Sequence, residues 1–122
     1  MKYACLVYLT ESEISSLSQS DWDSLNNECI ALGETLVASG RSLGGEALEP
    51  THTATTVRVR NGKVSAVDGP FAETKEQLAG FYELDARDMN EAIQVASKIP
   101  PARFGSIEIR PVRQLVPSNN SR

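Results

Sequence analysis

The sequence predicts an α+β domain of the split βαβ, ferredoxin-like type, with an inserted β-hairpin. Apolar segments typical of strands alternate with two segments whose apolar residues recur every three or four positions. Asn61-Gly62 lies between two short alternating runs, which is a strong hairpin signal. A chain of 122 residues has the length of one domain. We assign residues 1–113 to this domain and residues 114–122 to a polar tail.

The first strand and the first helix are expected in the N-terminal third. Residues 2–9 are apolar on both alternating faces, which predicts a strand buried on both sides and not at a sheet edge. Ser20 is a candidate N-cap because acidic residues follow it, and Gly40 is a candidate C-terminal signal. Between them, one helical face carries Trp22, Leu25, Cys29, Leu32 and Leu36.

The middle of the chain predicts an irregular strand and then a hairpin. Residues 41–48 contain Gly44-Gly45, and paired glycines indicate a bulge or a close backbone approach. Residues 53–60 alternate cleanly before Asn61-Gly62, and residues 63–67 form the returning strand.

A strand, a helix and a last strand complete the domain. Residues 78–84 are largely apolar, and residues 105–110 alternate. Asp88 and Glu91 have the spacing of a capping box. The helix that follows is expected to run up to Pro100, with one face formed by Met89, Ala92, Ile93, Ala96 and Ile99.

Two helices can cover only one face of such a sheet. Residues 2–9 and 78–84 carry apolar side chains on both faces, so the uncovered face would be a large exposed apolar patch. We therefore expect a homodimer in which two sheets pack face to face.

Charge and hydropathy exclude two classes of partner. A net charge of −4 argues against a nucleic-acid surface, which requires clustered lysine and arginine. The apolar runs are too short to span a bilayer, and residues 3–9 are too short for the core of a signal peptide. We expect a cytoplasmic protein.

The residue inventory predicts no metal and no cofactor. The single histidine, His52, and two separated cysteines are too few for a zinc or redox site within one chain. Cys5 and Cys29 lie in apolar patterns and are expected to be free, buried thiols. Gly44-Gly45 lacks the pattern of a nucleotide-binding loop.

Five short motifs occur in order along the chain: GGEAL at 44–48, TTVR at 55–58, DGPFAETKE at 68–76, GFY at 80–82 and GSIEIRP at 105–111. In these motifs the chain resembles the YCII-related family, specifically its DGPF branch, over residues 1 to about 113. The resemblance implies a dimeric α/β-barrel with a ferredoxin-like fold.

The resemblance implies less about function, because one fold supports many activities. The wider superfamily includes an enzyme that removes chloride from a chlorinated aromatic ring, and some members carry a proposed His-Asp pair with the histidine on the first helix. This chain has no histidine there, and His52 lies in the loop before Thr53, so that mechanism does not transfer. DGPF proteins also resemble partners of certain sigma factors, which leaves a regulatory role open.

Asp68 is the candidate catalytic residue. Its carboxyl group would serve as a general acid or base if burial raised its pKa toward neutrality. The alternative is a turn residue whose carboxylate accepts backbone N–H groups, with Gly69 and Pro70 completing the bend.

The other candidates are ligand-binding residues. Glu73 and Lys75 would surround a ligand, or else form weak surface ion pairs. Arg58 would hold an anionic group, or else pair across strands with an acid such as Glu46, itself a candidate. Tyr82 is a further candidate, with a core aromatic as its alternative.

Two functions remain open from the sequence. One is an acid-base enzyme, or an enzyme-like binder, that acts on a small polar or aromatic molecule. The other is a non-catalytic regulatory module that binds a sigma factor or another transcription protein.

Overall fold

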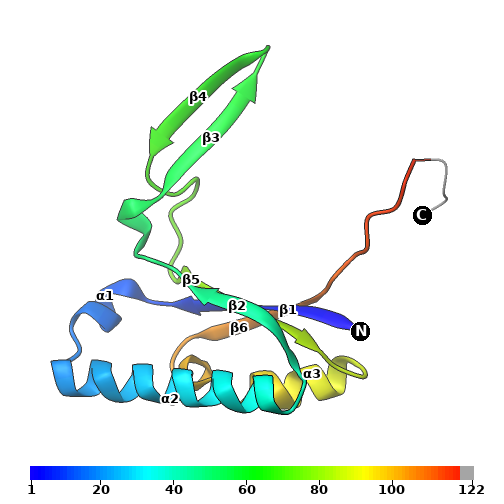
Figure 1. Ribbon diagram of the computed structural model, residues 1–122. Helices are drawn as coiled ribbons and strands as arrows, with labels where there is room; N and C mark the ends of the chain where they lie inside the picture. The colour runs from blue at the N-terminus through cyan, green and yellow to red at the C-terminus, as the bar shows by residue number, and fades with distance from the viewer. Residues whose placement is uncertain (119–122) are drawn as a thin grey trace.

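The computed structural model describes residues 1–118 and has the predicted ferredoxin-like α+β architecture. A four-stranded antiparallel sheet of order β2-β5-β1-β6 is covered on one face by α2 and α3, and the β3–β4 hairpin is a separate two-stranded sheet (Figure 1). Two 3-10 turns, Thr51–Thr53 and Pro100–Arg103, join these elements. The helices and strands are β1 (Lys2–Leu9), α1 (Glu11–Ser15), α2 (Gln19–Ala38), β2 (Ser42–Ala47), β3 (Thr55–Arg60), β4 (Lys63–Asp68), β5 (Gln77–Asp85), α3 (Met89–Ala96) and β6 (Ser106–Pro111).

The core lies between the sheet and the two longer helices. β1 pairs with β5 on one side and β6 on the other, which confirms its predicted central position. Its odd-numbered residues are buried, so they point toward the helices. They form one core with buried residues of β5, α2, α3 and the turn after α3: Cys5, Val7, Leu9, Leu36, Leu84, Val95, Ala96 and Ile99.

The start of α2 differs from the prediction. The helix begins at Gln19, and its N-cap is Ser18, whose hydroxyl oxygen accepts a hydrogen bond from the Asp21 N–H at 3.1 Å. Ser20 lies inside the first turn, so its assignment as the cap was wrong by two residues. Both serines precede acidic residues, and the sequence pattern alone does not distinguish them. The short helix α1 was not predicted at all.

The second predicted helix starts where the sequence indicates, but its buried residues differ from the prediction. Asp88 accepts the Glu91 N–H at 2.9 Å, whereas the Glu91 carboxylate accepts the N–H of Arg87 rather than that of Asp88. The helix ends at Ala96, four residues before Pro100. Ile93, on the predicted apolar face, is half exposed, whereas Val95, which was not assigned to that face, is buried.

The strand with paired glycines is irregular, as predicted. Its register against β5 shifts between Ser42 and Gly44. A Cβ atom at Gly45 would lie 2.5 Å from the Phe81 carbonyl oxygen, so the backbones approach too closely for a side chain. β2 pairs with β5 alone, so it is an edge strand of the sheet.

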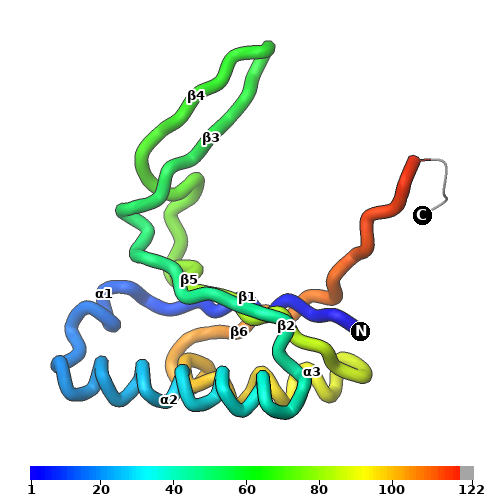
Figure 2. The backbone as a smooth tube through the Cα atoms, viewed as in Figure 1, coloured from blue at the N-terminus to red at the C-terminus, as the bar shows by residue number. Residues whose placement is uncertain are grey.

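The hairpin projects from the sheet, and its chain path is clearest in Figure 2. Asn61 and Gly62 have φ values of 53° and 73°, which matches the predicted two-residue turn. β3 begins at Thr55 rather than Thr53 because the 3-10 turn occupies the preceding residues.

The C-terminal part of the described chain has no regular structure. Residues 112–118 form neither helix nor strand, and residues 119–122 of the predicted tail lie outside the described residues. Within residues 1–118 we find no helix that is both long and apolar enough to cross a membrane.

Candidate functional site

The sheet face opposite the helices carries a continuous apolar strip. Leu6 on β1 is paired with Phe81 on β5, and Tyr8 is paired with Leu78. The helices do not cover these side chains, and Phe81 and Leu78 are each 36% exposed. We call Leu6, Tyr8, Leu78 and Phe81 the open-face strip.

Charged side chains flank the open-face strip. Two of the acids on this face have cationic neighbours: Glu83 lies 3.9 Å from Lys2, and Glu108 lies 2.9 Å from Arg110. Glu46 on β2 lies opposite Phe81, and within residues 1–118 its carboxylate forms no ion pair. Glu46 is therefore the unpaired acid beside the strip.

Backbone contacts hold the Asp68–Phe71 turn. Gly69 has a φ of 104°, its N–H donates to the Ala54 carbonyl oxygen at 2.7 Å, and its own carbonyl oxygen accepts the Thr56 hydroxyl at 2.8 Å. Phe71 projects into solvent with 80% of its surface exposed. The turn therefore presents an aromatic ring instead of burying it.

Asp68 is exposed at the end of β4. Within the described part of the chain its carboxylate accepts no hydrogen bond and forms no ion pair, so the proposed hydrogen bonds to backbone N–H groups are not present. The cross-strand register places Asp68 on the same hairpin face as Val57, Val59 and Val64. In a single chain nothing removes water from this carboxyl group.

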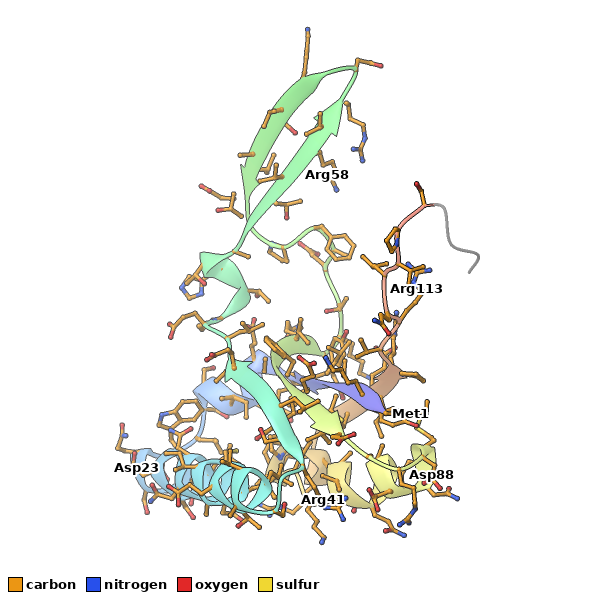
Figure 3. The ribbon with its side chains drawn as sticks, turned by 45° about the vertical axis from the view of Figure 1, so that its right-hand side comes forward. Met1, Asp23, Arg41, Arg58, Asp88 and Arg113 are labelled. Carbon is orange, nitrogen blue, oxygen red and sulfur yellow. The ribbon has the colours of Figure 1, made fainter. Side chains whose placement is uncertain are left out.

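The predicted cations lie apart from Glu46. Arg58 is in the middle of β3, opposite Ser65, and Figure 3 shows its side chain on the hairpin, away from the four-stranded sheet. Lys75 and Glu73 are exposed in the segment between β4 and β5. Arg58 and Glu46 belong to different sheets, so they do not form the predicted cross-strand pair within one chain.

Tyr82 lies on the other side of the sheet. It is paired with Cys5 and Gly45, is partly buried and packs against the core on the helix side. Burial raises the pKa of its hydroxyl, and the nearby Cys29 thiol raises it further. Since Glu46 and Tyr82 face opposite sides of the sheet, one ligand cannot contact both from one side.

One surface hollow involves none of the predicted site residues. It has a volume of about 420 Å³ and lies between α1, α2 and the 3-10 turn at Pro100–Arg103. Arg103 donates to both carboxylate oxygens of Glu28 at 2.9 Å, which lowers the pKa of Glu28. No local pattern links two residues so far apart in sequence, so this hollow could not be predicted from the sequence.

A second hollow of about 310 Å³ lies where the N-terminus meets the start of α3. The Met1 ammonium group contacts Asp85 at 3.1 Å, and Arg41 contacts Glu91 at 2.7 Å. Hydrogen bonds from the Arg87 N–H and the Arg41 side chain lower the pKa of Glu91. Each hollow thus contains an ion pair formed within the chain.

The described residues offer no metal cage. Between positions 1 and 118 no three His, Cys, Asp or Glu side chains lie close enough together to hold an ion. Cys5 is a buried free thiol and Cys29 a partly buried one, and neither is in a disulfide.

Comparison with known proteins agrees with the motifs. A family model described as the YCII-related domain matches residues 1–116. The chain belongs to the YCII-related family. An uncharacterised protein of Rhizobium meliloti (strain 1021) is 38% identical over 114 residues, which cover 92% of each chain. The resemblance based on the five motifs is confirmed, and the name of this YCII-related relative states no activity.

Proposed function

We propose that this YCII-related protein is a homodimer that binds a small polar or aromatic molecule beside the Asp68–Phe71 turn, over the open sheet face. The observation that carries the proposal is the open-face strip, an apolar surface with charged groups at its borders. Ligand sites combine such an apolar floor with a few polar groups that orient the ligand.

A second subunit supports this site by closing it. The sheet carries apolar side chains on both faces, but the helices cover only one of them. The open-face strip is therefore in contact with water. A copy of the chain packed against that strip would enclose a space between the two sheets. Phe71, which projects from the turn, would then lie at the border of that space.

Asp68 would be the acid-base residue of such a dimer. It lies at the base of the valine face of the hairpin, formed by Val57, Val59 and Val64. A ligand packed against Asp68 would remove water from its carboxyl group and favour the neutral form. Lys75 and Glu73 are available beside the turn to bind polar groups of the ligand, whereas Tyr82 lies on the other side of the sheet.

The experiment is a thermal-shift screen of small aromatic acids and polar metabolites, followed by calorimetry on each hit. A ligand at 100 times its dissociation constant should stabilise the native protein by about 2.7 kcal/mol and raise the melting temperature by several degrees. Asp68→Asn should abolish turnover of the hit or its stabilising effect, because a carboxyl group that exchanges protons is lost.

The matched control is Asp23→Asn, which changes an exposed acid on α2 far from the turn along the chain. This variant should respond to the ligand as the wild type does. Stabilisation by no compound, together with direct binding of a purified sigma factor, would instead favour the regulatory module.

A further inference from the structure

We infer that the β3–β4 hairpin clasps the second copy of this chain and that Arg58 on it pairs with the partner's Glu46. The inference rests on the proposed homodimer and assigns Arg58 to subunit pairing, which leaves Lys75 as the cation for a ligand. The pair would form twice in a two-fold symmetric dimer, since each subunit supplies both residues.

The first observation is that the hairpin lacks packing of its own. Its strands pair only with each other, and an isolated two-stranded hairpin is marginally stable in water. Val57, Val59 and Val64 on one face are 62%, 56% and 72% exposed. Both faces of the hairpin are therefore largely exposed in one chain, including the face that carries Arg58.

The second observation is the shape of the molecule. The hairpin and the C-terminal segment both rise from the side of the sheet opposite α2 and α3, and a wide space separates them (Figures 1 and 2). Six residues of strand span roughly 20 Å, whereas packed sheets lie about 10 Å apart. The hairpin is long enough to pass alongside a second sheet that rests on the open-face strip.

The third observation is the charge of the hairpin. Arg58, Arg60 and Lys63 share the face opposite the valines, in a protein whose net charge is −4. Figure 3 shows Arg58 on the side of the hairpin where the C-terminal segment runs, which is the side that borders the space. Within residues 1–118 no carboxylate pairs with Arg58. A cationic projection on an acidic protein fits another copy of that protein.

Glu46 is the complementary group. It lies on the edge strand β2 beside the open-face strip, and it is the acid there without a cationic neighbour among the described residues. A subunit packed on the strip would take Glu46 out of water, which is strongly unfavourable unless a cation accompanies it. An arginine is the best such partner because its guanidinium binds a carboxylate through two hydrogen bonds.

Charge reversal tests the pair. Glu46→Arg and Arg58→Glu should each raise the dimer dissociation constant at least tenfold, and the double variant should restore it to within about threefold of the wild type. Both residues are exposed in the single chain, so neither change should prevent folding. Lys98→Glu, an exposed charge change on the helix side, is the control and should leave the constant unchanged. Analytical ultracentrifugation over a dilution series measures the dimer dissociation constant of all four variants.

Cross-linking locates the hairpin directly. Two cysteine variants are prepared as separate proteins in a Cys29→Ser background and mixed. One is Leu48→Cys, two residues after Glu46 and just past the end of β2, and the other is Ser65→Cys, opposite Arg58. A short bismaleimide should join them only in the mixture.

Three results are possible. A cross-link between the two variants, with rescue by the double reversal, supports the clasp. A dimer with no cross-link and no response to either reversal overturns the clasp and leaves the proposed dimer and its ligand site standing. A wild-type protein that is monomeric at micromolar concentration overturns the clasp and the proposed dimer together.

Discussion

Neighbouring residues of one strand occupy opposite environments in this protein. Cys5 has no exposed surface in the core, whereas Leu6 beside it belongs to the open-face strip. Desolvation by burial raises the pKa of the Cys5 thiol to about 11. The pKa of the Cys29 thiol is also raised, mainly by burial and further by the Glu28 carboxylate, whereas the nearby Arg103 lowers it. Both thiols therefore remain protonated at neutral pH and pack as small apolar groups.

The raised pKa of Cys5 predicts a loss of stability at alkaline pH. An unfolded chain releases this proton near pH 9.0, whereas the folded chain keeps it until about pH 11. The contribution of the neutral thiol is complete below pH 9 and is lost as the pH rises toward 11. The advantage of the wild type over Cys5→Ala in the free energy of unfolding should therefore shrink by on the order of 2 kcal/mol between pH 8 and pH 11. Urea denaturation at each pH measures it, and a constant difference would contradict the prediction.

Local signals explain most of the individual elements. Asn61-Gly62 predicted the hairpin, Gly44-Gly45 predicted the irregular strand, and Asp88 predicted the start of α3, because each signal acts over a few residues. The sequence did not predict that Val95, and not Ile93, would be buried, because this depends on how α3 lies against the sheet.

The candidate site was less predictable than the elements. Glu46 and Tyr82 were assigned to one ligand site, but the structure places them on opposite sides of the sheet. The alternation of a strand divides its residues into two faces, and it does not say which face the helices will cover. The strand that carries Arg58 was predicted correctly. Its sheet is separate from the sheet that carries Glu46, and this tertiary arrangement could not be predicted from local sequence.

The true start of α2 gives a prediction for that element. Ser18→Ala removes the oxygen that accepts the Asp21 N–H, so it should lower the free energy of unfolding by about 1 kcal/mol. Ser20→Ala is the matched control, because Ser20 lies within the helix, where alanine is at least as favourable, and it should not destabilise the protein. Chemical denaturation of both variants measures the difference. Equal loss in both would show that Ser18 is not the cap.

At the scale of the whole molecule, helices cover one face of the sheet and leave the other face uncovered. On the helix side, α2 and α3 cover the core of the sheet. On the other side, Phe71 and the valine face of the hairpin are exposed, and the open-face strip is partly exposed. Exposed apolar surface distributed over three neighbouring elements is typical of an interface. A second subunit packed on the open-face strip would cover the strip along its length, whereas a small ligand alone would cover only part of it.

Phe81→Asp tests this view of the whole molecule. The new carboxylate would lie in the middle of the open-face strip, where a packed partner would remove its water, so the dimer dissociation constant should rise at least a hundredfold, or about 3 kcal/mol. Light scattering at micromolar concentration should give twice the chain mass of 13.2 kDa for the wild type and a single chain mass for the variant. Ile93→Asp is the control, because Ile93 is an exposed apolar residue on the helix side, and this variant should remain dimeric. Phe81 is already 36% exposed in one chain, so the variant should keep its fold, which circular dichroism can verify. A folded Phe81→Asp protein that still has twice the chain mass would exclude the open-face strip as the dimer interface.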